Sequence, residues 1–123
     1  MSVQVKICGL NDAEGFDAAV AAGADMAGFV FCPPSPRAVT PAAAAALSAR
    51  HAGTGPLRVG LFVDATDEAI AAVLAALPLD ILQLHGEEEP ARCAAIRARF
   101  GLPVMKALGV ATQDDLARLE AYA

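Results

Sequence analysis

Apolar runs alternate with polar, turn-forming segments along the whole chain. Five apolar runs of strand length begin near Val3, Met26, Leu57, Leu79 and Pro103. Their start-to-start spacings of 23, 31, 22 and 24 residues indicate one repeating unit. Runs such as 27–31 and 59–63 are almost uniformly apolar instead of alternating, which is typical of strands buried on both faces in a parallel sheet.

The segments between these runs carry helix signals. The expected helix starts are Asn11 with Glu14, Thr40 before Pro41, Thr66 before Asp67 and Glu68, and Thr112 before Asp114 and Asp115. Apolar residues then recur at helical spacing, as at Phe16, Ala19 and Val20 or at Ile70, Val73 and Leu77. The pattern predicts a strand–helix unit repeated five times in one domain that spans residues 1–123.

Sequential strand–helix repeats fit two α/β architectures, an open doubly wound sheet and a closed barrel. The spacing alone does not separate them. A dinucleotide-binding sheet would carry a G-x-G-x-x-G turn after its first strand, whereas residues 8–14 contain a single glycine followed by acidic side chains. We therefore set a dinucleotide-binding sheet aside.

Composition narrows the class of partner. Hydrophobic residues make up 56% of the chain, which is enough for a core, and the net charge of -5 with nine scattered Lys and Arg residues argues against nucleic acid. No apolar stretch approaches the ~20 residues that span a bilayer. Met1-Ser2-Val3 leads into a strand without a charged leader, so we expect no membrane partner and a cytoplasmic location.

The cysteines lie at positions 8, 32 and 93. Their odd number and their spacing favour neither a disulfide framework nor a zinc site, so we expect reduced thiols and no metal.

Cys8 ends the first apolar run, and Gly9 follows it. If the fold is a barrel, catalytic groups lie at this end of the strand, although a small thiol in an apolar strand is also common as core filling. Lys6 lies two residues earlier on the same strand face, where its cation would stabilise a thiolate if the two side chains point the same way. Both interpretations of Cys8 stay open at this point.

Four other polar residues stand near predicted strand ends. Arg37 follows the proline-rich segment 32–36, so it is either a surface charge or a guanidinium placed for bidentate capture of a carboxylate. His85 ends the fourth run, with Gln83 on the same face, and is either structural or in contact with substrate. Asp64 either lines the pocket or begins the cap of the next helix.

We assign no catalytic or binding role to three further features. His51 lies in a polar loop and is expected to be exposed, and Cys93 is expected to pack beside Ile96 and Phe100. The run 87–89 is read as the first turn of a helix, favoured by the helix dipole.

Several motifs together identify a family resemblance. They are Lys6-Ile7-Cys8-Gly9, Gly28-Phe29-Val30-Phe31, Ser35-Pro36-Arg37, Val59-Gly60-Leu61-Phe62-Val63 and Leu82-Gln83-Leu84-His85-Gly86. In this order and spacing they resemble the phosphoribosylanthranilate isomerases of tryptophan biosynthesis. The resemblance runs to Lys106-Ala107, so it covers essentially the whole chain.

The resemblance implies a (β/α)8 TIM barrel, of which this chain carries about the first five βα units. It also implies an Amadori rearrangement of N-(5-phosphoribosyl)anthranilate to 1-(2-carboxyphenylamino)-1-deoxyribulose 5-phosphate, an aldose–ketose isomerisation without a cofactor. By resemblance Cys8 is the base that removes the proton from sugar C2, an aspartate at the end of strand six is the acid, and Arg37 holds the anthranilate carboxylate. The further substrate-binding candidates are His85, Gln83 and Asp64, and the supporting residues are Lys6 and Gly9.

The chain departs from the family pattern after the fifth unit. We find no counterpart of strands six to eight, which would supply the acid and the phosphate-binding loops, so the chain on its own is expected to be inactive and to self-associate through open sheet edges. One alternative is another phosphosugar barrel such as indole-glycerol-phosphate synthase, although its lysine-rich mouth is not seen. The others are a non-catalytic half-barrel assembly module and, for the fold of this piece, a flavodoxin-like open sheet.

Overall fold

The computed structural model describes residues 3–122 as a single parallel sheet with helices between its strands. The strands are β1 (Lys6–Cys8), β2 (Met26–Val30), β3 (Leu57–Phe62), β4 (Ile81–Leu84) and β5 (Val104–Lys106). They pair in the order β1-β2-β3-β4-β5, all parallel. Because each strand lies beside its neighbour in sequence and the order never reverses, the flavodoxin-like alternative is wrong.

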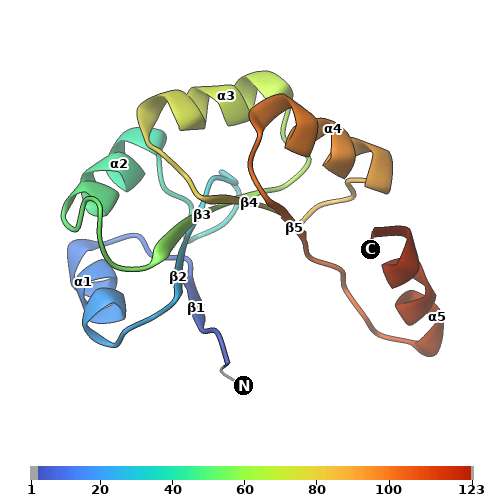
Figure 1. Ribbon diagram of the computed structural model, residues 1–123, viewed down its shortest axis with the longest axis horizontal. Helices are drawn as coiled ribbons and strands as arrows, with labels where there is room; N and C mark the ends of the chain where they lie inside the picture. Colours follow the sequence, from blue (N-terminus) through green and yellow to red (C-terminus); the bar gives the residue numbers. More distant parts are fainter. Residues whose placement is uncertain (1–2, 123) are drawn as a thin grey trace.

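The helices are α1 (Ala13–Ala21), α2 (Pro41–Ala49), α3 (Asp67–Ala76), α4 (Pro90–Phe100) and α5 (Gln113–Leu116), and a 3-10 helix, η1 (Ala117–Tyr122), follows α5. The sheet is strongly curved, and α1 to α4 lie along its convex side while the concave side carries none of them (Figure 1). A curved parallel sheet with its helices on the outside is the wall of a β/α barrel, as the family resemblance implies.

The main core lies between the sheet and these helices. Its most buried large side chains are Phe16, Phe29, Phe62, Ile70, Leu82, Leu84 and Ile96. The rings of Phe16 and Phe29 stack with centroids 5.9 Å apart, which joins α1 to β2. Burial of each such side chain stabilises the fold by about 1.5–3 kcal/mol. Val59 and Leu61, which alternate along β3 with Gly60 and Phe62, are also buried, so β3 is covered on both faces as the apolar run 59–63 predicts.

Three of the four expected helix caps are confirmed. Thr40 and Thr66 accept hydrogen bonds from the N–H groups three residues later, each at 3.1 Å, and Thr112 forms a capping box with Asp115. The first cap was assigned to the wrong residue: Asp12, not Asn11, accepts the hydrogen bond from the N–H of Gly15, at 2.7 Å. Asn and Asp cap equally well, so two adjacent candidates cannot be separated by residue type.

Two expectations about polar loop residues are wrong. The acidic run 87–89 does not form a first helical turn, because α4 begins at Pro90 with Glu89 as its N-cap, and Glu88 is buried before the helix. The side chain of His51 is only 31% exposed, since its Nε2 lies 2.9 Å from Asp17 Oδ1 and its ring packs against Phe16. In both cases a tertiary contact draws a polar side chain inward.

The start of β1 is later than the apolar run suggests. The N–H of Val5 donates to Asp25 Oδ2 at 2.7 Å, and the strand ladder begins at Lys6, opposite Met26. Residues 1, 2 and 123 lie outside the described residues. The expected start without a charged leader falls on the first two of them, and the expected domain 1–123 includes all three. Among residues 3–122, none of the helices has the length and apolar character needed to cross a membrane.

Candidate functional site

The carboxyl ends of the strands bring Cys8 next to a glycine of β2. Cys8 is half-buried and pairs in register with Gly28, whose carbonyl accepts hydrogen bonds from the N–H groups of Gly9 and Leu10 at 3.1 and 3.2 Å. A Cβ at position 28 would lie 3.1 Å from Cys8 Sγ, closer than ordinary contact. The thiol therefore occupies a space that only a glycine in β2 leaves open.

Arg37 lies across the loop that follows Cys8. Gly9 has a φ of 80°, and a Cβ there would stand 2.5 Å from Arg37 Cδ and 3.3 Å from its Nη1. The proline-rich segment folds back on itself, because the N–H of Ser35 donates to the carbonyl of Cys32 and the N–H of Arg37 donates to Ser35 Oγ. The structure thus places the exposed Arg37 side chain against Gly9, next to Cys8, where its guanidinium can bind an anion.

Lys6 and Gln83 meet across the concave face. Lys6 Nζ donates to Gln83 Oε1, and Gln83 is buried. Lys6 and Cys8 are both half-buried and flank the exposed Ile7, so they share a strand face as predicted. No hydrogen bond joins Lys6 to Cys8 in residues 3–122, however, and the ammonium is held by an amide oxygen of β4.

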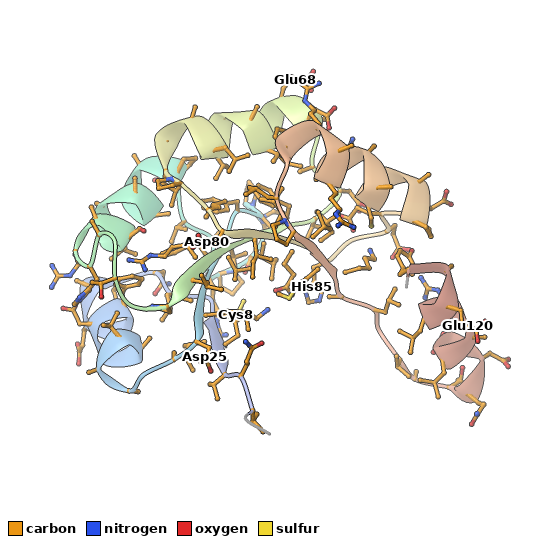
Figure 2. The ribbon with its side chains drawn as sticks, viewed as in Figure 1. Cys8, Asp25, Glu68, Asp80, His85 and Glu120 are labelled. Carbon is orange, nitrogen blue, oxygen red and sulfur yellow. The ribbon has the colours of Figure 1, made fainter. Side chains whose placement is uncertain are left out.

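His85 and Cys8 lie on the same side of the sheet. Figure 2 shows both on the concave side, opposite the helices. The N–H of His85 donates to the carbonyl of Phe62 at 2.9 Å, which extends β4 by one residue and leaves the imidazole exposed. Gln83 and His85 therefore lie on the same face of β4, as the alternation along the strand predicts. Gln83 is buried, and His85 lies at the exposed rim.

Asp64 follows β3 and adopts a φ of 47°, a left-handed conformation that few non-glycine residues tolerate. Its Oδ1 accepts a hydrogen bond from the N–H of Glu87 at 2.9 Å. Since Thr66 is the N-cap of α3, the alternative that Asp64 caps this helix is wrong. The side chain instead ties the loop after β3 to the loop after β4.

The residues that the sequence reasoning missed are Glu88 and its partner Lys106. Glu88 Oε1 lies 2.8 Å from Lys106 Nζ, with the side chains 3% and 7% exposed. Burial alone would raise the pKa of Glu88, but hydrogen bonds from Lys106 and from the N–H groups of Asp64 and Gly86 lower it below the ordinary value. A run of three glutamates before a proline resembles a helix start, and nothing local distinguishes the buried one.

Two further features lie away from Cys8 and Arg37. A cavity of about 640 Å³ lies at the opposite, amino ends of the strands, where its lining includes Ser48, Arg58 and Asp80. Cys93 packs against the core from α4, as expected, and burial raises the pKa of its thiol. A raised pKa keeps this thiol neutral, which fits packing and not nucleophilic chemistry.

Among residues 3–122, no group of three or more His, Cys, Asp or Glu side chains is placed to hold a metal ion. Cys8, Cys32 and Cys93 are free thiols.

The sequence and the fold were compared with those of known proteins. The family model for N-(5′-phosphoribosyl)anthranilate (PRA) isomerase matches residues 5–122. The chain belongs to the PRA isomerase family. It is 58% identical over 122 residues to the N-(5′-phosphoribosyl)anthranilate isomerase of Paracoccus denitrificans, a match that covers 99% of this chain and 56% of that relative.

Solved PRA isomerases share the fold. The crystal structure of the Thermotoga maritima phosphoribosylanthranilate isomerase superposes with a TM-score of 0.90 at 39% identity, over 98% of this chain and 58% of that one. A second PRA isomerase structure, in complex with reduced 1-(o-carboxyphenylamino)-1-deoxyribulose 5-phosphate, gives the same TM-score and identity over 98% of this chain and 61% of that one. The predicted β/α-barrel fold class is confirmed.

The chain spans a little over half the length of these relatives. The comparisons support neither indole-glycerol-phosphate synthase nor a non-catalytic assembly module, and none of them bears out the expectation that the chain on its own is inactive.

Proposed function

We propose that the protein acts as a PRA isomerase in tryptophan biosynthesis, with Cys8 as its base. The observation that carries the proposal is the free thiol of Cys8 at the carboxyl end of β1, opposite Gly28 and beside the loop crossed by Arg37. The position is the one where β/α barrels carry catalytic groups. The PRA isomerase crystallised with a reduced deoxyribulose phosphate shows that a relative of the same fold binds a ligand of this class.

The reaction would be an aldose–ketose isomerisation that neither gains nor loses atoms. An acid protonates the furanose ring oxygen of the aminoaldose, and the ring opens to an iminium ion. The Cys8 thiolate then removes the proton from sugar C2, and the resulting enolamine tautomerises to the ketone. The acid is not assigned to any of residues 3–122, and the steps need no cofactor.

Arg37 and His85 would bind the substrate. The exposed guanidinium of Arg37 can form two parallel hydrogen bonds with the anthranilate carboxylate, which a lysine cannot. His85 would donate or accept a hydrogen bond from the concave rim. Asp64, which is exposed but bonded to the N–H of Glu87, would line the same rim less directly.

Gln83 and Lys6 would act as a hydrogen-bonded pair on the strand face that carries Cys8. Because Gln83 accepts a hydrogen bond from Lys6, the pair fixes a positive charge on the face that Cys8 shares. Gly9 would support the site by leaving room for Arg37.

The setting of the enzyme is part of the proposal. A biosynthetic isomerase of a small phosphorylated metabolite fits the cytoplasm. Self-association of the 123-residue chain through β1 and β5, the outermost strands of the described sheet, is supported only by their position. Size-exclusion chromatography that returns a compact monomer would contradict it.

The proposed function is tested by turnover. The chain is joined to the part of the Paracoccus denitrificans relative that it does not match, and the loss of phosphoribosylanthranilate is followed by fluorescence. We expect turnover by this chimera, whereas a folded chimera without turnover would contradict the proposal. The 123-residue chain assayed alone shows whether residues 1–123 suffice, and a parallel assay for indole-glycerol phosphate tests the alternative enzyme.

A further inference from the structure

Glu88 joins the ends of three strands through one buried carboxylate. Its Oε2 accepts a hydrogen bond from the N–H of Asp64 at 2.9 Å, after β3. Its Oε1 accepts one from the N–H of Gly86 at 2.8 Å, after β4, and one from Lys106 Nζ at 2.8 Å, at the end of β5. We define these contacts, together with the bond from Lys106 Nζ to the carbonyl of Gly86 at 2.6 Å, as the Glu88 clamp.

The Glu88 clamp lies on the helix side of the sheet and is enclosed there. Lys106 pairs in register with Leu84, a core residue, so its side chain leaves the sheet on the helix side. The hydroxyl of Tyr122 donates to the carbonyl of Glu88 at 2.9 Å, and Lys106 Nζ lies 5.8 Å from the centre of the Tyr122 ring. A buried ion pair with further hydrogen bonds is held firmly, because either charge left alone would be costly to bury. Glu88 therefore does not reach the concave face on which Cys8 lies.

The clamp fixes the backbone on the C-terminal side of His85. Both the N–H and the carbonyl of Gly86 are bonded within it, and the N–H of His85 is bonded to Phe62 on the other side. Asp64 presses directly on Gly86, since a Cβ there would lie 2.7 Å from Asp64 Cγ. Because the Cα–Cβ direction of a residue follows from its backbone, these bonds together fix the direction in which the side chain of His85 leaves β4.

We propose that Glu88 is a positioning residue of the isomerase, which acts through His85 by holding the turn after β4. The inference rests on the proposed function of this site and deepens it. It states that the buried ion pair of Glu88 and Lys106, on the helix side of the sheet, orients His85, a proposed substrate-binding residue on the concave side. The left-handed backbone of Asp64 belongs to the same arrangement, since its N–H is directed at Glu88 while its carboxylate is bonded to the N–H of Glu87.

Glu88→Gln is the sharpest test, because it keeps the size of the side chain. One acceptor oxygen becomes an NH2 donor, so the N–H of either Asp64 or Gly86 loses its partner. Glu87→Gln is the matched control: it makes the same chemical change one residue earlier, on an exposed side chain. Lys106→Arg, which keeps the charge but moves it, serves as a second variant if Glu88→Gln does not fold.

The first readout needs no activity. The chain has two histidines, so its NMR spectrum contains two imidazole Cε1–H signals, from His51 and His85. In Glu88→Gln we expect amide exchange at Asp64 or Gly86 to quicken about tenfold. We also expect the His85 signal to shift while the His51 signal stays in place. Faster exchange with an unmoved His85 signal, or no change in either, would overturn the proposal.

The second readout is a double-mutant cycle in the chimera. We expect Glu88→Gln to lower kcat/KM about tenfold and to cause no further loss when His85→Asn is already present, because a positioning residue acts only through the group it positions. Equal losses from Glu88→Gln with and without His85→Asn would show a merely structural role and refute the proposal. If the wild-type chimera has no turnover, the proposed function fails, while the NMR readout still decides whether Glu88 orients His85.

Discussion

Gly28→Ala tests whether the space around Cys8 matters for the proposed chemistry. The new Cβ would lie 3.1 Å from Cys8 Sγ and 3.3 Å from Cys8 Cα. Ordinary contact between such atoms begins at about 3.5–4.0 Å, so the thiol must move by about 0.5 Å. A misplacement of about 1 Å can cost about 100-fold in rate, and half of that displacement corresponds to about tenfold in kcat.

The same substitution has a limited effect on stability. Overpacking costs about 1–3 kcal/mol, and removal of a glycine from a strand offsets about 0.5–1 kcal/mol of it. We therefore expect a net loss of about 0–2.5 kcal/mol in the free energy of unfolding, small enough for the variant to fold.

The assay compares kcat by fluorescence in the chimera with urea unfolding of the same samples. Gly109→Ala is the control, because a Cβ at position 109 meets nothing within 4 Å and no positive φ has to be maintained there. A folded Gly28→Ala protein whose kcat stays within twofold of the wild type would refute the argument that the thiol must occupy its present position.

Two predictions concern stability. Arg58 is buried and donates to Ser48 Oγ and to four backbone carbonyls. A lysine ammonium has fewer donors than this set of acceptors needs, so Arg58→Lys should lose at least two of these hydrogen bonds and lower the free energy of unfolding by about 2–5 kcal/mol in urea titrations. A loss below 1 kcal/mol would contradict this. Hydrogen bonds from Arg50 and then His51 lower the pKa of Asp17 from 3.8 to about 2, so its contribution to stability is present above pH 3.8 and lost as the pH falls toward about 2. Asp17→Asn should flatten the decline of stability across that window, and an unchanged acid profile would count against it.

Features fixed by neighbouring residues could be predicted from the sequence. Thr40 and Thr66 were identified as caps because their partners, the N–H groups of Ala43 and Ala69, lie three residues away and the hydrogen bond is local. The five strands were found because apolar runs of strand length recur at regular spacing, and two of these runs, 27–31 and 59–63, are almost uniformly apolar and need burial on both faces. The position of Cys8 at a strand end followed from the same pattern.

Features fixed by distant residues could not be predicted. Glu88 looks like its exposed neighbours until Lys106, 18 residues away, pairs with it. The role of Gln83 in substrate binding stays a prediction, and its hydrogen bond with Lys6, 77 residues away in sequence, could not be predicted. His51 was expected in solvent until the fold brought Asp17 to it. In each case the residue type allows both states, and only the tertiary partner decides between them.

The central claim is that Cys8 is the base of a PRA isomerase, and turnover by Cys8→Ser in the chimera tests it most directly. A serine hydroxyl is a far weaker base than a thiolate, so kcat should fall about 10²–10⁴-fold. Cys93→Ser, which changes a thiol of α4 that packs against the core, should keep the wild-type kcat. Turnover by Cys8→Ser at the rate of Cys93→Ser would contradict the account.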